Sequence, residues 1–169
     1  IYNHLDLANS AAMVGEALGL TFAGFALTLL FGSALVDWMG MRKMLLLSAV
    51  GYVLGSAMIL VASLMPVTPL VSWLVLGGLL LTGLGWGAVE AASNPMVATI
   101  YPEEKTHRIN VLHAWFPGGI VVGGLAGFAI SALSLAWQWN IVLLVLPSLV
   151  LTWMVFKTIF PVTERVSSG

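Results

Sequence analysis

The side chains most able to do chemistry in this sequence lie inside apolar stretches. Glu90 is a carboxylate that follows a long uncharged run, and Asn94 comes at i+4, on the same face of a helix. In a membrane-spanning helix an ionisable side chain costs about 2.5–3.5 kcal/mol at the centre, so its presence indicates a function. Because burial favours the protonated form of a carboxylate, Glu90 is predicted to take up and release a proton.

A second polar pair lies further along the chain, at Asn110 and His113. Their spacing of three puts both on one helix face, at a depth that overlaps that of Glu90. We therefore expect Glu90 and His113 to line one polar cavity, as partners of each other or as contacts of a solute. A hydrogen bond that only joins two helices is the alternative explanation.

Two aromatic residues accompany these polar groups. Trp86 comes one turn before Glu90, and Phe116 follows His113 by three residues. Aromatic faces beside polar groups suit a sugar ring, although a tryptophan in a membrane helix is more often a packing residue. No His, Asp or Glu set has the spacing of a metal site, and the sequence contains no Cys. We expect neither a metal nor a cofactor.

The composition decides what kind of element positions these residues. Of the 169 residues, 60% are hydrophobic and 8% are charged, against about 25% charged residues in soluble domains. Such a chain has too little charge to cover the surface of a soluble fold. The composition therefore excludes a soluble globular protein, a disordered chain and a nucleic-acid binder, and the lack of Cys excludes a disulfide scaffold.

The positions of the charges predict five membrane-spanning helices. Residues 17–36, 44–89 and 109–156 contain no Asp, Glu, Lys or Arg. A spanning helix needs about 20 apolar residues, so the two longer runs each hold two helices and a turn. The sequence predicts an all-α membrane protein, with a short loop at 37–43 after the first helix. The expected helices are 11–36, 44–64, 70–100, 109–133 and 139–159.

The basic residues predict the orientation in the membrane. All of them fall on one side of this arrangement, which the positive-inside rule assigns to the cytoplasm. They are Arg42, Lys43, Lys105, Arg108, Lys157 and Arg165. We expect an extracytoplasmic loop at 1–10, a transmembrane bundle at 11–159 and a cytoplasmic tail or linker at 160–169. The protein is predicted to be integral to the cell (inner) membrane.

Glycine is frequent in these apolar runs, and much of it recurs at intervals of four. Small residues at that spacing let helix backbones approach closely in lipid. We expect helix contacts at three such sets, which are Gly15 and Gly19, Gly83 and Gly87, and Gly119, Gly123 and Gly127.

The loop expected after the first helix resembles a loop motif of the major facilitator superfamily. Leu35, Asp37, Gly40 and Arg42 carry the resemblance. Physically, the Asp can cap a helix N-terminus and pair with the Arg, which would make a latch that is remade as two helices slide. A plain polar turn is the alternative.

A longer resemblance covers residues 83–95 and 108–118, which look like the fourth and fifth helices of the fucose permease branch of sugar transporters. The resemblance implies that Glu90 is a protonation site and that Asn94 belongs to the Asn-Pro of that branch. It also implies that His113, three residues after Asn110, occupies a sugar-contacting position. Nearly the whole chain then corresponds to helices two to six of a twelve-helix fold, within its N-terminal six-helix half.

Together these observations favour a secondary active transporter of a sugar or similar small polar solute, working by proton-coupled symport. Its expected partners are the solute, the proton, the lipid bilayer, and a first helix and C-terminal half that lie outside this sequence. Nucleic acid is not an expected partner. An exporter of drugs or metabolites from the same superfamily is the alternative, and a membrane-embedded enzyme or a non-transporting scaffold is less favoured.

Overall fold

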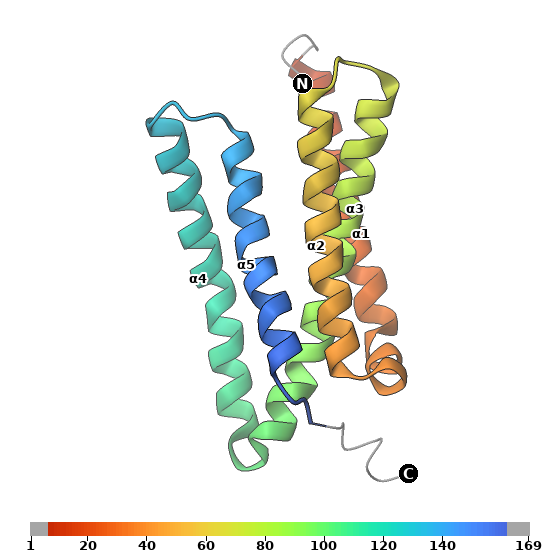
Figure 1. Ribbon diagram of the computed structural model, residues 1–169, viewed down its shortest axis with the longest axis vertical. Coiled ribbons are helices and arrows are strands. Elements are labelled where there is room, and N and C mark those ends of the chain that lie inside the picture. The colour runs from red at the N-terminus through yellow and green to blue at the C-terminus, as the bar shows by residue number, and fades with distance from the viewer. Residues whose placement is uncertain (1–6, 162–169) are drawn as a thin grey trace.

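The computed structural model describes residues 7–161, and in that range it consists of long helices joined by short connections, without a strand (Figure 1). Residues 1–6 and 162–169 lie outside the described part, and with them most of the predicted terminal loop and tail, including Arg165. The elements are α1 (Leu7–Met39), α2 (Met41–Leu64), α3 (Pro69–Ile100), the 3-10 turn η1 (Pro102–Glu104), α4 (Lys105–Ala132) and α5 (Gln138–Lys157).

The structure confirms the predicted fold class. Five of the described helices are long and apolar enough to cross a membrane, so the protein is an integral membrane protein. Consecutive helices run in opposite directions, and the α1–α2 turn, η1 and the end of α5 lie at one end of the bundle (Figure 1). The described basic residues all lie near that end, which we call the basic end: Arg42, Lys43, Lys105, Arg108 and Lys157.

The connection between α1 and α2 is much shorter than the loop expected at 37–43. Both helices continue into that segment and leave only Gly40 between them. Gly40 has a φ of 84°, which is in the left-handed region that glycine adopts without a Cβ clash. Its N–H donates to the carbonyl oxygen of Val36 at 2.8 Å and closes α1. Charged residues can lie in the terminal turns of a helix. The charge pattern therefore predicted a loop that is longer than the one in the structure.

Helix α4 also begins earlier than expected, at Lys105 instead of 109. Of the charged residues expected in a loop, Lys105 and Arg108 lie in its first turn, and Glu103 and Glu104 lie in η1 directly before it. Arg108 pairs with Glu104 at 2.9 Å, at a spacing of i+4. Such pairs stabilise a helix start in the aqueous region.

Helix α3 lies against α1 through two glycines on one of its faces. A Cβ on Gly83 would collide with the backbone of Thr21, and a Cβ on Gly87 would lie 2.7 Å from the carbonyl oxygen of Phe25. The two backbones therefore approach as closely as glycine permits. This is the contact that the spacing of Gly83 and Gly87 predicts.

A second face of α3 packs on α2 in the same way. A Cβ on Gly85 would lie 2.8 Å from the carbonyl oxygen of Ser48, and a Cβ on Gly55 of α2 would lie 2.5 Å from the carbonyl oxygen of Gly78. Near the basic end, a cluster of buried residues from α1, α2, α3 and α5 completes the core: Val36, Met41, Met44, Leu45, Ala88, Ala92 and Val155. Helix α3 is thus held from two sides.

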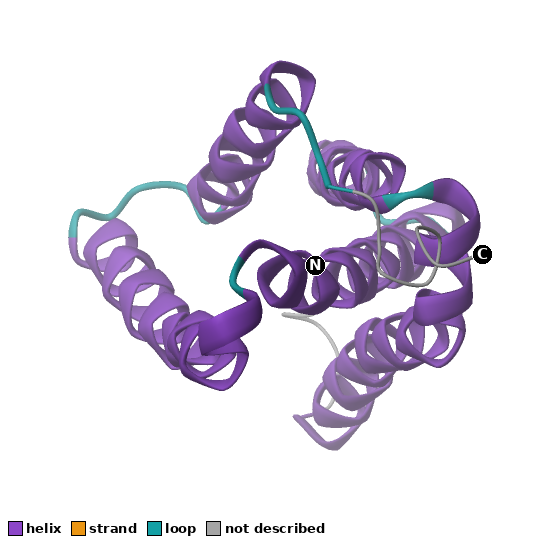
Figure 2. Ribbon diagram, turned by 90° about the horizontal axis from the view of Figure 1, so that it is seen from below, coloured by secondary structure: helices purple, strands orange, loops and turns teal. Residues whose placement is uncertain are grey.

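Helix α5 packs against α2, and its Val155 belongs to the buried core, whereas α4 makes few contacts with the other helices and lies to one side of the bundle (Figures 1 and 2). A groove of about 520 Å³ between α4 and α5 is lined by apolar and small residues, with Asn140 as the polar exception. Gly119 and Gly123 face this groove, and a Cβ on either would meet nothing within 4 Å. In the described residues the glycine repeat of α4 therefore makes one close approach, between Gly127 and Asn140, where a Cβ would lie 3.3 Å from Oδ1.

The close packing of α3 on α2 predicts an unequal response to two glycine substitutions. Gly85→Ala is expected to destabilise the full-length protein by about 1–3 kcal/mol, because the new Cβ overpacks the interface with Ser48. Gly19→Ala is the matched control, because a Cβ there meets nothing within 4 Å in the described chain. Unfolding of the purified protein in detergent measures both variants. Equal stability of the two would contradict the close approach.

Candidate functional site

A third face of α3 carries the chemically active side chains and looks toward α4. Trp86, Glu90 and Asn94 follow one another at intervals of four and therefore line up along the helix. The glycine faces hold the other sides of α3 against α1 and α2. This packing fixes the rotation of α3, and so it decides which residues meet α4.

Glu90 is the centre of a polar cluster that joins the two helices. Its Oε1 accepts a hydrogen bond from Nδ2 of Asn94 at 3.3 Å and lies 3.7 Å from Nδ1 of His113. The Glu90 side chain is 29% exposed and that of His113 is 51% exposed. The structure thus brings together three of the predicted site residues, on a surface that the described helices leave partly open.

Asn94 holds one unused hydrogen-bonding atom in this cluster. Its Oδ1 is buried and has no hydrogen-bond partner among the described residues. A buried amide oxygen without a donor is costly. Asn94 can therefore accept one more hydrogen bond than it makes here.

Aromatic rings continue the same face toward the other end of α3. The ring of Trp86 lies nearly parallel to that of Phe116 on α4, with centroids 5.8 Å apart and an interplanar angle of 10°. On its other side it contacts Phe25 at 4.2 Å and Phe22 at 5.7 Å, both from α1. The sequence interpretation missed these two phenylalanines, although their spacing of three on one helix would have grouped them.

Asn110 lies one turn before His113 on α4 and is exposed. No described contact joins it to Glu90 or Asn94. Asn110 therefore stays a predicted residue of the substrate cavity, and it does not belong to the cluster of Glu90, Asn94 and His113. Among the described residues, no group of three or more His, Cys, Asp or Glu is placed to hold a metal ion.

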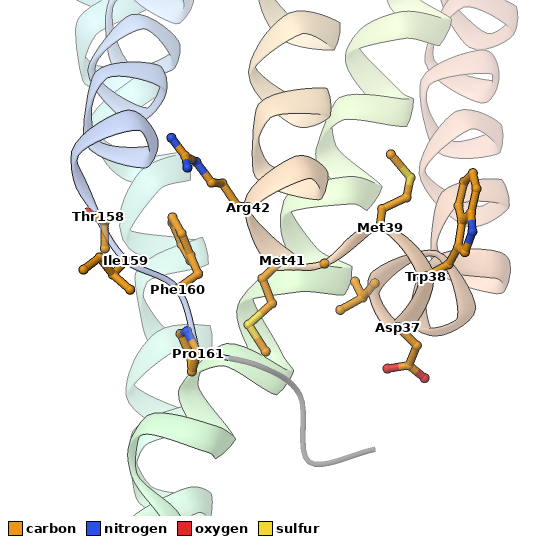
Figure 3. A pocket seen from close by; sticks show the side chains of 11 residues that line it. Asp37, Trp38, Met39, Met41, Arg42, Thr158, Ile159, Phe160 and Pro161 are labelled. Carbon is orange, nitrogen blue, oxygen red and sulfur yellow. The ribbon is translucent and has the colours of Figure 1, made fainter. Parts of the chain in front are cut away.

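The turn around Gly40 differs from the predicted latch. Asp37 lies in the last part of α1, and α2 begins without a side-chain cap at its N-terminus. Figure 3 shows that the side chains of Asp37 and Arg42 point away from each other. The prediction that Asp37 caps α2 and pairs with Arg42 is therefore wrong for the described structure.

Arg42 contacts the end of α5 instead. Its Nη2 donates to the carbonyl oxygen of Phe156 at 3.5 Å, and its guanidinium carbon lies 5.8 Å from the centroid of the Phe156 ring. The last carbonyls of a helix have no partner in the helix, and a cation there interacts favourably with the helix dipole. Residues 36–42 and 158–161 line a cavity of about 520 Å³ beside this contact (Figure 3).

Comparisons with known proteins extend the sequence resemblance. A family model described as the Major Facilitator Superfamily matches residues 2–169. The tetracycline resistance protein, class E, of Escherichia coli is 34% identical over 125 residues, which cover 69% of this chain and 29% of that protein. No solved structure gives a significant match.

Two further relatives have names that refer to sugars. Solute carrier family 2, facilitated glucose transporter member 8, of Bos taurus is 32% identical over 164 residues, covering 96% of this chain and 30% of that protein. Monosaccharide-sensing protein 2 of Arabidopsis thaliana is 28% identical over 166 residues, covering 97% and 21%. The chain spans less than a third of the length of each of these relatives.

The ring contact between α3 and α4 predicts an energetic coupling. In a double-mutant cycle, Trp86→Ala and Phe116→Ala are expected to show about 0.5–1.5 kcal/mol of interaction in the stability of the full-length protein, as stacked aromatic pairs do. Trp115→Ala is the control, because Trp115 neighbours Phe116 but is 74% exposed. A coupling no larger than that between Trp86 and Trp115 would speak against the contact.

The contact of Arg42 with α5 predicts a smaller loss of stability. Arg42→Ala is expected to cost about 0.3–1 kcal/mol, because it removes a cation from the C-terminal end of a helix. Lys43→Ala provides the comparison, since Lys43 is the next residue along α2 and is also exposed. Thermal unfolding in detergent at low ionic strength measures the difference. If both variants lose the same stability, Arg42 has no specific role at α5.

Proposed function

Because this chain belongs to the Major Facilitator Superfamily, we propose that the full-length protein is a secondary active transporter of a sugar or similar small polar solute. Membership confirms the superfamily predicted from the sequence, whereas the fucose permease branch stays a prediction. The family also favours a transporter over the membrane-embedded enzyme and the scaffold.

One observation carries the proposal: a carboxylate, an amide and an imidazole meet on the surface between α3 and α4, with aromatic rings directly beside them. A sugar needs donors and acceptors for its hydroxyl groups and a flat apolar surface for its ring face. Glu90, Asn94 and His113 supply the first, and Trp86 and Phe116 supply the second. The sugar-related names of two relatives support the same substrate class.

Proton coupling is proposed for Glu90. Its ionised carboxylate accepts a hydrogen bond from the Asn94 amide, and the side chain becomes neutral when it binds a proton. A neutral side chain costs less inside the membrane than a charged one, so a conformational change that moves the residue is easier after protonation. Proton binding at Glu90 would therefore permit the change of access that carries the solute, which makes the mechanism a symport.

The turn around Gly40 is proposed to act as a latch, with other contacts than the sequence suggested. Arg42 ties the α1–α2 turn to the end of α5 through the carbonyl of Phe156. A contact between helix ends can break and reform when helices slide. Asp37, Gly40 and Arg42 remain the proposed latch residues.

Location and missing partners complete the proposal. We place the basic end of the bundle, and with it the C-terminal tail, on the cytoplasmic side of the cell membrane. A first helix and a C-terminal half from outside this chain would complete the fold. The groove between α4 and α5, with its open glycines, offers room for such a helix.

An exporter of drugs or metabolites is the second candidate function. The tetracycline resistance protein matches this chain at an identity similar to that of the sugar-related relatives. The rings of Phe22, Phe25, Trp86 and Phe116 would also suit a flat aromatic drug. Thermal stabilisation of the purified full-length protein by tetracycline, and by no hexose, would favour this alternative.

The proposed role of Glu90 predicts separate effects on coupling and exchange. In proteoliposomes with a proton gradient of about one pH unit, one-to-one symport supports about tenfold accumulation of solute. Glu90→Gln is expected to abolish this accumulation but to preserve exchange of labelled solute, because the amide keeps the size of the side chain and cannot release a proton. The assay uses the full-length protein and a panel of labelled hexoses that includes glucose.

Glu16→Gln is the matched control, since Glu16 is an exposed acid on α1 far along the sequence from the cluster. It should accumulate solute like the unmodified protein. Undiminished accumulation by Glu90→Gln would show that Glu90 is not the coupling site. Stabilisation by no hexose, together with no uptake of any of them, would overturn the sugar proposal itself.

A further inference from the structure

We propose that His113 shares the coupled proton with Glu90, so that the coupling site is a carboxylate–imidazole pair between α3 and α4 and not a lone carboxylate. The proposal rests on the proposed function for the role of the proton in transport, but the existence of the pair is independent of it. It gives His113 a second task beside the sugar contact that the sequence implies.

The side chains of His113 on α4 and Glu90 on α3 are close enough for a proton to pass from one to the other. Nδ1 of His113 lies 3.7 Å from Oε1 of Glu90, which is a little longer than a hydrogen bond and within the range of an ion pair. Both side chains are partly exposed, so a small rotation of either closes the gap. An imidazole is the side chain whose ordinary titration range lies nearest to neutral pH.

The pair is isolated from other ionisable groups. Glu90 is the one ionisable residue of α3, and it lies about 15 Å from the basic end of that helix, at about 1.5 Å per residue. His113 lies about 12 Å from the start of α4 by the same measure. In the described chain, no other ion pair involves either residue.

The remaining charged and titratable groups of the elements around α3 lie elsewhere. Helix α1 carries Glu16 and Asp37, which lie toward its opposite ends. Helix α2 carries Arg42 and Lys43 in its first turn and Tyr52, which lies toward the face that packs on Gly85. In η1 and the first turn of α4 are Glu103, Glu104, Lys105, His107 and Arg108.

A proton transfer inside the pair removes both charges at once. When His113 is protonated and Glu90 is ionised, the Nδ1–H bond breaks and an Oε1–H bond forms, which leaves neutral imidazole and neutral carboxylic acid. No other reactant is needed. The pair changes from an attraction between opposite charges to a neutral contact, and the imidazole becomes free to bond a solute hydroxyl.

Asn94 is suited to both states of the pair. It donates Nδ2–H to the ionised Glu90 at 3.3 Å, while its buried Oδ1 has no partner among the described residues. The two ends of an amide have nearly the same shape, so a half-turn exchanges them. After that half-turn Oδ1 accepts the O–H of protonated Glu90. The orphaned oxygen is thus the acceptor for the proton-loaded form.

The pair is also well placed to control the position of α4. Away from the turn at the basic end, this pair and the stacked rings of Trp86 and Phe116 join α3 to α4. Loss of the charge attraction therefore weakens the contact that holds α4. A proton can by this route loosen one helix without disturbing α1, α2 and α3.

Infrared difference spectroscopy on the purified full-length protein tests the pair without any solute. The C=O stretch of protonated Glu90 is identified by its loss in Glu90→Gln and is followed against pH. In His113→Gln, the pH midpoint of this band is expected to move by about one pH unit or more, which is an about tenfold change in proton affinity, as for charges within 4–6 Å of each other. His107→Gln is the matched control and should leave the midpoint unchanged.

An unchanged midpoint in His113→Gln would overturn the proposal. His113→Asn is a second variant, in case the first one does not fold, and Glu90→Gln should in turn move the pH midpoint of the His113 signal in protein with labelled histidine. A transport arm keeps the proposed function separate. The number of protons moved per labelled hexose should fall in His113→Gln, a ratio that does not depend on how much hexose the variant binds, and an unchanged ratio would refute the role of His113 in coupling.

The outcomes of the two arms are distinguishable. If the unmodified protein moves no hexose with protons but the midpoint shifts in His113→Gln, the proposed function fails and the proton-sharing pair stands. If hexose symport is intact and the midpoint does not shift, the proposed function stands and the pair is refuted.

Discussion

The close approach of α3 to α1 and α2 is the constraint on which the site depends. In lipid there is little hydrophobic gain in bringing two helices together, so the contact relies on backbone packing. Gly83 and Gly87 allow this contact toward α1, and Gly85 allows it toward α2. With two faces of the helix fixed in this way, the remaining face is left for α4. Glu90, Asn94 and Trp86 lie on that face, away from the glycine contacts.

A partly exposed carboxylate is tolerated on that face because it has hydrogen-bonding partners for either charge state. Glu90 has an amide donor on its own helix and an imidazole on the next one. A glutamine would satisfy the same neighbours without the cost of burying a charge. A carboxylate with partners that can either donate or accept a hydrogen bond is the arrangement that the proposed proton-binding site requires.

The sequence predicted the elements well because the membrane imposes strong rules on composition. Charge-free runs gave the five helices, and helix periodicity grouped Glu90 with Asn94. What it could not predict was the rotation of one helix against another, which depends on packing between distant segments. For this reason Phe22 and Phe25 on α1 were missed as neighbours of Trp86. Arg42 was assigned to Asp37, although its described contact is Phe156, more than one hundred residues away in the sequence.

The unequal packing of the bundle has a consequence for how such a protein moves. Helix α3 is held by backbone contacts that do not change with protonation, whereas the contacts of α4 with it include the Glu90–His113 pair and a ring contact. A packed glycine interface has one arrangement, because any shift opens voids or creates clashes. A contact between two side chains can be made and broken at small cost. On the proposed mechanism, motion that follows proton binding at Glu90 should therefore begin in α4, with α3 as the fixed support.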